Sequence, residues 1–394
     1  MRYSGIVVLA SVTLILGGCA DQPLGPGPQV NSHQPGATVA GDVATTFQGA
    51  IGPGSSYEIQ VPPSWNGDLV LYAHGYVDPQ GQEPLTAFEQ SMLQQLPTLG
   101  YAVAYSSFSK NGLAVKDAIQ RTKQLRGIFV SKVREPTRTY VTGGSMGGLV
   151  ALALAERFPG QYDGALALCG MVGGSQAQID YVSNVRVLFD AFYPGALPGS
   201  LFDNQPLIPT QVAAAVATAV QANPGGLAAL NSVMATTFGT PLPGATPADV
   251  VTSLVSALTF DVRGFSDVLD ATHGHSPFDN TAVHYAGSPD DAALNLAVAR
   301  YTATPDALAY LAHYYTPSGA LTIPTVTLHN ALDPVVPAFH ESLLAEAVDN
   351  AGDAGSLVQL TSSTFGHCDF STPEVMGAFS TLAGWVESGV RPGS

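Results

Sequence analysis

The chain has 394 residues, of which 46% are apolar and only 11% are charged. This composition is that of a folded protein with a large buried core, and it excludes a disordered chain. Fourteen basic residues stand against 30 acidic ones, which gives a net charge of −16. Such a charge would repel nucleic-acid phosphates, so we expect no nucleic-acid partner.

The N-terminus predicts a bacterial lipoprotein signal over residues 1–19. Arg2 precedes an apolar run, residues 6–16, that is too short to span a bilayer comfortably. The sequence LGGC that ends at Cys19 resembles the lipoprotein cleavage site, after which the cysteine carries acyl chains. Several acyl chains anchor a protein firmly. We expect an exported protein held at the bacterial cell envelope, on its periplasmic or cell-surface side, by this N-terminal lipid alone; an ordinary secretory peptide is the alternative.

After the signal, residues 20–42 are rich in Pro, Gly, Gln and Asn and predict a flexible tether. From residue 43 onward, short apolar runs alternate with helical patterns. Strands are expected at residues 44–47, 56–61, 68–73, 101–105, 139–142 and 164–169, and helices at residues 112–133 and 149–158. This alternation predicts a mainly parallel sheet with helices on both faces.

The alternation stops between residues 173 and 320, where helical stretches are separated by Pro and Gly turns. The expected helices are residues 209–222, 248–258, 290–301 and 305–315. We interpret them as a helical cap, or lid, inserted after the sixth strand. Strand and helix patterns then resume at residues 323–329, 337–348, 356–361 and 373–388, so the predicted core comprises residues 43–172 and 321–394.

The most informative motif is GGSMG at residues 143–147, which lies between a predicted strand and a predicted helix. This context is typical of a nucleophile elbow, a sharp turn that exposes a serine hydroxyl. The residues two before and two after the serine must be small, as Gly143 and Gly147 are. A serine hydroxyl needs a base, and the base needs an acid to orient it.

Two later loops supply the candidate acid and base. Asp333 lies just past the predicted strand at residues 323–329, and His367 lies just past the strand at residues 356–361. The order Ser145, Asp333, His367 is that expected of α/β-hydrolases, in which these loops converge at one edge of the sheet. His329 is a rival base, and a simple turn before proline is the alternative interpretation of Asp333.

With this order of motifs, residues 43–390 resemble secreted α/β-hydrolases of the serine esterase and peptidase-like type, with a cap between the sixth and seventh strands. The resemblance implies that Ser145 is the nucleophile, that His367 is the general base and then the acid, and that Asp333 orients His367. It also implies an oxyanion hole formed by the backbone amides of Met146 and Tyr76. In the matching element His74-Gly75-Tyr76, we interpret the histidine as a buried supporting residue.

If Cys19 is lipidated, Cys169 and Cys368 remain as an even pair in a compartment that permits disulfides. A bridge between them could fix the loop of His367, and two free buried thiols are the alternative. The neighbouring His367 and Cys368 resemble a pair found in tannases and feruloyl esterases, in which a disulfide joins cysteines beside the catalytic serine and histidine. Here, however, Gly144 occupies the position before the nucleophile.

The leading functional hypothesis is a monomeric serine hydrolase that cleaves carboxylic esters, small or polymeric, through an acyl-enzyme without a cofactor. The apolar cap would line an acyl or aryl pocket. A peptidase or amidase of the prolyl-oligopeptidase-like branch is the alternative, and an inactive binding lipoprotein is a third. No metal is expected, because the spacing of the cap histidines and acids fits no zinc or calcium pattern; these are His273, His275, His284, Asp270 and Asp279.

Overall fold

The computed structural model describes residues 44–79, 85, 87–203 and 207–393. The predicted signal peptide, Cys19 and the tether lie outside these described residues. No helix of the described part is long and apolar enough to cross a membrane.

Eight strands of the described part form one sheet in the order β1-β2-β4-β3-β5-β6-β7-β8. β2 runs antiparallel to both of its neighbours, and the pairs from β4 to β8 are parallel. The strands are β1 Thr45–Ala50, β2 Ser56–Val61, β3 Leu69–Ala73, β4 Ala102–Ser106, β5 Thr139–Gly144, β6 Gly164–Leu168, β7 Thr325–Leu332 and β8 Leu357–Phe365. The predicted mainly parallel sheet is confirmed.

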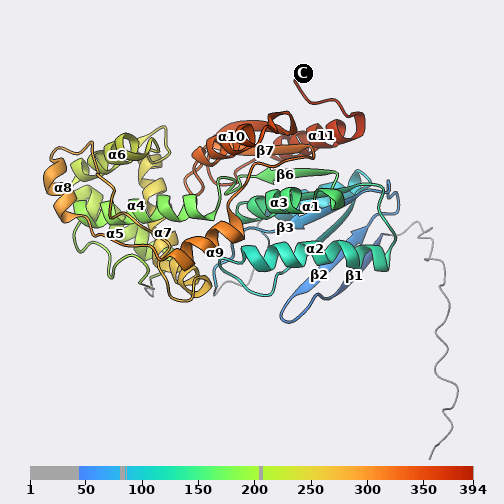
Figure 1. Cartoon of the computed structure of the whole chain (residues 1–394), viewed down its shortest axis with the longest axis horizontal. Helices are drawn as coiled ribbons and strands as arrows, with labels where there is room; N and C mark the ends of the chain where they lie inside the picture. Colours follow the sequence, from blue (N-terminus) through green and yellow to red (C-terminus); the bar gives the residue numbers. More distant parts are fainter. Residues whose placement is uncertain (1–43, 80–84, 86, 204–206, 394) are drawn as a thin grey trace, which may run out of the picture. The chain divides into compact units, whose positions relative to one another are not determined.

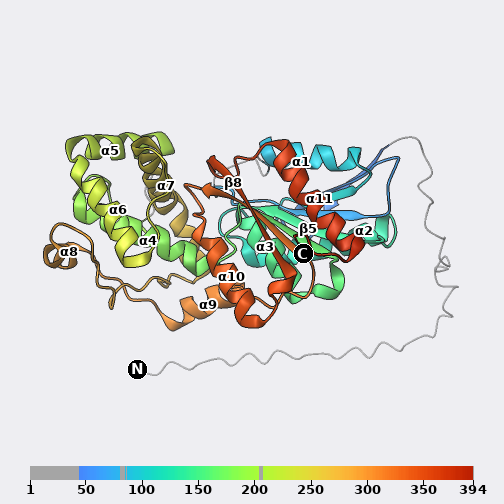
Figure 2. The ribbon, with the colours of Figure 1, turned by 90° about the horizontal axis from the view of Figure 1, so that it is seen from above.

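Helices cover both faces of this sheet because successive strand residues point to opposite sides. In β3, Leu69 and Leu71 join an apolar cluster with α2 and α3, whereas Val70 and Tyr72 join a second cluster with α1 and α11. Figure 2 shows α1 and α11 together over one face. The helices of the core are α1 Ala87–Thr98, α2 Val115–Lys132, α3 Met146–Arg157, α10 Phe339–Ala351 and α11 Thr372–Ser388.

Six helices lie between β6 and β7 in the described chain; α4 to α8 gather into a separate group, and α9 also packs on α2 of the core (Figure 1). They are α4 Ser175–Phe192, α5 Pro209–Ala222, α6 Pro224–Phe238, α7 Pro247–Ala271, α8 Asp291–Ala297 and α9 Pro305–Tyr315. The predicted insertion of a helical cap after the sixth strand is therefore confirmed as part of the fold class. The first cap helix, α4, packs against α6, α7 and α9.

Two cap helices differ in length from the prediction, and each difference has a local cause. α7 continues past residue 258 to Ala271 because its buried apolar stripe continues through Val262, Phe265 and Val268. α8 ends at Ala297, not at residue 301, because the chain is drawn away from the helix: the amide of Tyr301 donates to the side chain of Asn280 over 2.7 Å. α1, α4 and α6 were not among the predicted helices.

One buried cation holds the centre of the cap. Arg186 of α4 is fully buried, and its guanidinium donates to Asp261 of α7 over 2.5 Å and to Asp190 over 2.9 Å. It also donates to the carbonyl oxygens of Pro198 and Gly199 over 3.2 and 3.0 Å. Arg186 is the charged partner of the buried carboxylate of Asp261. Removal of Arg186 therefore leaves that carboxylate without its counter-charge.

We therefore expect Arg186→Met to lower the free energy of unfolding by about 3–5 kcal/mol, the usual cost of breaking one side of a buried ion pair. Urea denaturation of the purified protein measures it. The control is Glu135→Gln, which breaks the exposed pair with Arg126 and should cost at most about 1 kcal/mol. Equal effects of the two substitutions would contradict this account of the cap.

Candidate active site

The turn from β5 into α3 places Ser145 at the carboxyl edge of the sheet. Its backbone φ is 56°, in the left-handed region that residues with a Cβ seldom adopt. A Cβ on Gly147 would lie 2.0 Å from the carbonyl oxygen of Ala73, and one on Gly143 would lie 2.4 Å from that of Gly147. Glycine at both positions is thus what lets β3, β5 and α3 approach closely enough to form the elbow.

The structure brings Ser145, His367 and Asp333 together in one hydrogen-bonded chain. Nδ1 of His367 lies 2.8 Å from Oδ2 of Asp333, and Nε2 lies 2.9 Å from Oγ of Ser145. A carboxylate can only accept, so Nδ1 carries the hydrogen and donates. Nε2 then accepts from the serine hydroxyl, which is the arrangement that a base requires.

The loop after β7 fixes the acid. Asp333 is fully buried, and its second oxygen, Oδ1, accepts from the amides of Val335 and Val336 over 2.8 and 2.9 Å. One oxygen therefore holds the loop while the other faces His367. Asp333 is thus an integral part of this turn, and its side chain has little freedom to move away from the imidazole.

His329, the rival base, is hydrogen-bonded to the loop of Asp333. Its Nε2 donates to the carbonyl oxygen of Val336 over 2.8 Å, and its Nδ1 lies 3.2 Å from the carboxylate of Glu341. Burial works against a charged ring here, but the carboxylates of Glu341 and Asp333 prevail and raise the pKa of His329. Both nitrogens are engaged within β7 and its surroundings, so the residue beside Ser145 is His367.

The two residues predicted to form the oxyanion hole, Met146 and Tyr76, line the same cavity as Ser145. Met146 is the first residue of α3, where a main-chain amide has no acceptor within its own helix. Tyr76 follows Gly75, and a Cβ on Gly75 would lie 3.4 Å from the Cβ of Ser145. Among the described residues, the amide of Tyr76 donates to no other group.

Buried groups hold the loop of Tyr76 in place. The amide of Gly75 donates to the carboxylate of Glu89 on α1 over 3.0 Å, and the hydroxyl of Tyr72 donates to the same oxygen over 2.9 Å. His74 is buried and stacks on Phe108 with ring centroids 3.8 Å apart. Burial lowers the pKa of His74, so the neutral ring acts as a packing support for the loop.

Cys169 and Cys368 form a disulfide with Cα atoms 5.2 Å apart. Cys169 directly follows β6, and Cys368 directly follows His367, so the bridge ties the loop of His367 to the sheet. A Cβ on Gly144, the position before the nucleophile, would lie 3.9 Å from the sulfur of Cys169. The bridge therefore reaches the neighbourhood of the elbow from the adjacent strand.

Core and cap together enclose a cavity of about 150 Å³ above Ser145. Its apolar wall includes Met171 from the core and Ile179, Phe260 and Val268 from the cap. Gln178 of α4 also lines it, but its side chain donates to the carbonyl oxygen of Val335 over 2.8 Å and lies 3.0 Å from Nε2 of His340. The cavity thus presents the Ser145 hydroxyl to a mostly apolar space.

The only cluster of three metal-ligand side chains found among the described residues is Cys169, His367 and Cys368. Both sulfurs are joined in the disulfide, and the imidazole is hydrogen-bonded to Ser145 and Asp333. These groups are therefore committed to the arrangement above. The cap histidines at 273, 275 and 284 belong to no such cluster in the described part of the chain.

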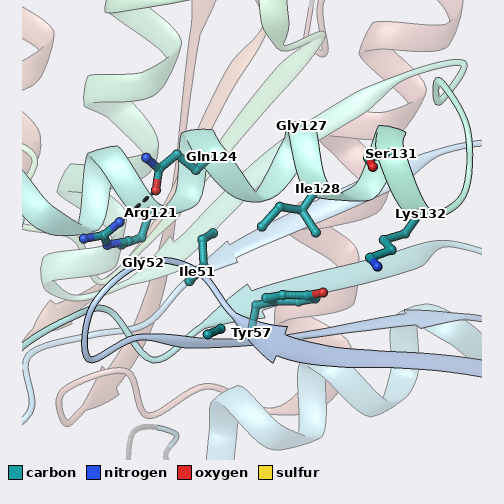
Figure 3. Close-up of a pocket in the computed structure, with 10 residues that line it drawn as sticks. Ile51, Gly52, Tyr57, Arg121, Gln124, Gly127, Ile128, Ser131 and Lys132 are labelled. Carbon is teal, nitrogen blue, oxygen red and sulfur yellow. Dashed lines mark hydrogen bonds between the residues drawn. The ribbon is translucent and has the colours of Figure 1, made fainter. Parts of the chain in front are cut away.

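A second, wider hollow of about 630 Å³ lies between α2 and the loop that joins β1 to β2 (Figure 3). Arg121 at its edge is already engaged, since it donates to Ser109 over 2.8 Å and to Gln124 over 2.9 Å. No histidine or carboxylate is present among its described lining residues. The hydrogen-bonded chain of Ser145, His367 and Asp333 lies instead at the smaller cavity.

A family model described as "Esterase: Putative esterase" matches residues 121–213, less than half of the chain. The matched segment begins within α2, contains the elbow with Ser145, β6 and α4, and ends before Asp333 and His367. No curated protein is significantly similar to this chain in sequence.

Several solved structures are similar to this chain. An esterase from Aspergillus oryzae is 15% identical, over 86% of this chain and 78% of its own, with a TM-score of 0.46. Feruloyl esterase B from Aspergillus oryzae is 14% identical, over 89% and 81%, with a TM-score of 0.45. An acylaminoacyl peptidase from Pyrococcus horikoshii is 10% identical, with a TM-score of 0.41; 85% of this chain is covered, and it spans 39% of that protein.

The strand order and the elbow are those of the α/β-hydrolase fold, and the matched segment of the chain is similar to an esterase family. The resemblance predicted from the sequence is confirmed at this level.

The disulfide gives a first test of the site's construction. The double variant Cys169→Ala/Cys368→Ala should lose about 2–5 kcal/mol of unfolding free energy and react more slowly with a fluorophosphonate, because the loop of His367 is no longer tied to β6. Urea denaturation and labelling time courses measure both effects. Dithiothreitol should impair the wild type in the same way and leave the double variant unchanged; a wild type insensitive to verified reduction would contradict this role.

Proposed function

We propose that this protein hydrolyses carboxylic esters through an acyl-enzyme on Ser145. The observation that carries the proposal is the chain of hydrogen bonds from Ser145 through His367 to Asp333, 2.9 and 2.8 Å long, at the mouth of an apolar cavity. In this chain the serine hydroxyl donates to Nε2 of His367, which supports transfer of the hydroxyl proton to Nε2 as the oxygen attacks a carbonyl carbon.

In the proposed first step, Oγ of Ser145 bonds to the carbonyl carbon while His367 takes its proton. The carbonyl oxygen becomes an oxyanion, which the amides of Met146 and Tyr76 stabilise. As the ester C–O bond breaks, the imidazolium returns the proton to the departing alcohol. A water molecule then gives a proton to His367 and attacks the acyl carbon. The bond from that carbon to Oγ breaks, His367 returns the proton to Oγ, and the acid is released. Asp333 stabilises the imidazolium in both halves.

The character of the cavity supports an ester with a small apolar acyl or aryl group. The cavity has a volume of about 150 Å³, and an apolar cavity of about that size accommodates a group the size of benzene. Gln178 and Tyr76 are both engaged with protein groups, at 2.8 Å from Val335 and Asp267 respectively. Ser175 is the one polar side chain in the described wall of the cavity that has no hydrogen-bond partner. Few polar groups thus remain to pair with a peptide backbone, which favours an ester over a peptide substrate.

We also propose that the enzyme acts at the bacterial cell envelope. The support is the sequence of residues 1–19, with its apolar run and the LGGC that ends at Cys19. A lipid on Cys19, followed by the tether of residues 20–42, would hold the catalytic body near the membrane.

The proposed roles predict the effect of two neighbouring carboxylates. Asp333→Asn should lower kcat on p-nitrophenyl butyrate by about 10⁴-fold, because the amide no longer fixes the reactive tautomer of His367. Asp369→Asn, which changes an exposed carboxylate two residues beyond His367, should leave kcat within about twofold of the wild-type value.

Ser145→Ala should abolish fluorophosphonate labelling. A wild type that cleaves aminoacyl p-nitroanilides faster than p-nitrophenyl esters would overturn the ester assignment in favour of a peptidase, and one that cleaves neither and does not label would favour a binding protein.

The size of the cavity predicts a preference for short acyl chains. Wild-type kcat/KM should be highest for acetyl to butyryl or benzoyl esters and fall for octanoyl esters. Phe260→Ala, which removes a ring from the cavity wall, should raise kcat/KM for the octanoyl ester about tenfold relative to acetyl. Phe238→Ala, which removes a cap ring that packs on Tyr285 instead, should leave the ratio unchanged. An unaltered ratio in Phe260→Ala would show that acyl groups bind elsewhere.

A further inference from the structure

We propose that Asp267, on cap helix α7, is a positioning residue that holds the oxyanion-hole loop against the nucleophile through Tyr76. The inference rests on the proposed function, because it concerns the stabilisation of the same oxyanion. It gives the cap a part in the rate of the reaction as well as in the shape of the pocket.

The first link is a hydrogen bond between distant parts of the chain. The hydroxyl of Tyr76 donates to Oδ2 of Asp267 over 2.8 Å, across 191 positions of sequence. The ring of Tyr76 also packs against Phe260 of α7, with centroids 5.2 Å apart. α7 passes close to this hydroxyl, since a Cβ on Gly264 would lie 3.0 Å from it.

A second link joins the same loop to the same face of α7. Arg263 donates from Nε and Nη2 to Oδ2 of Asp78, over 2.8 and 2.5 Å. Arg263 and Asp267 are four residues apart on a helix, so their side chains lie on one face. Residues 76 and 78 are therefore both fastened to one turn of α7.

The hydroxyl of Tyr76 has a single hydrogen, and it donates that hydrogen in its hydrogen bond to Asp267. Burial and the carboxylate of Asp267 both raise the pKa of Tyr76, so the hydroxyl remains protonated and donating. The group that Tyr76 can offer an oxyanion is then its main-chain amide. Two hydrogen bonds fix the position of that amide. Glu89 of α1 accepts from the amide of Gly75 over 3.0 Å, and Asp267 of the cap accepts from the hydroxyl of Tyr76.

The test separates loss of positioning from loss of structure by measuring kcat and KM for p-nitrophenyl butyrate. Asp267→Ala should lower kcat about 10–100-fold with KM within about twofold, because loss of a complete oxyanion donor costs about 10²–10³-fold and this change displaces one. Asp267→Asn keeps an oxygen acceptor for the hydroxyl and should retain at least a third of wild-type kcat. Asp270→Ala removes an exposed carboxylate from the same helix and should change neither constant.

Tyr76→Phe deletes only the hydroxyl and provides the decisive variant if Asp267→Ala fails to fold. It should lower kcat as much as Asp267→Ala does, and the double variant should be no slower than either single variant, because one interaction is removed in all three. Wild-type kcat in Tyr76→Phe, an effect confined to KM, or additive losses in the double variant would overturn the inference. A wild type without esterase activity would instead overturn the proposed function.

Discussion

The close approach of β3, β5 and α3 at Gly143 and Gly147 is the constraint on which the rest of the site depends. A Cβ at either glycine would lie within 2.4 Å of a carbonyl oxygen, and the packed backbone cannot move to remove this clash. In the tight turn that the two glycines allow, Ser145 has a left-handed φ of 56°. Its hydroxyl lies at the edge of the sheet where the parallel strands end. Cys169 and Cys368, also with positive φ, lie at the same edge, and such strained residues tend to gather at functional sites.

Two histidines near the loop of Asp333 show how the surroundings shift the pKa of one kind of side chain in opposite directions. His329 faces the Glu341 carboxylate, and its pKa is raised. His340 is fully buried, and burial lowers its pKa to about 3, so it is neutral. Its Nδ1 accepts from the amide of Gly173 over 3.0 Å, and its Nε2 donates to Gln178 over 3.0 Å. Both therefore serve the architecture around Asp333, which leaves proton transfer to His367.

The sequence predicts the parts of this site that local patterns control. The elbow is recognisable because small residues flank Ser145 between a strand and a helix, and Asp333 and His367 are recognisable because each follows a strand in a fixed order. The cap contacts are not predictable in this way. Asp267 and Arg186 resemble ordinary charged residues of helices, and their partners Tyr76 and Asp261 lie 191 and 75 positions away. Only the packing of the cap on the core brings Tyr76 to Asp267, and only the packing of one cap helix on another brings Arg186 to Asp261.

Two cap helices are hydrogen-bonded to loops of the core that lie beside Ser145. Gln178 of α4 donates to the carbonyl oxygen of Val335 in the loop that carries Asp333, over 2.8 Å, and Asp267 of α7 accepts from Tyr76 over 2.8 Å. α4 and α7 pack on each other, and Arg186 and Asp261 join them through a buried ion pair. A displacement of this helix pair would therefore disturb the loop of Asp333 and the loop of Tyr76 together.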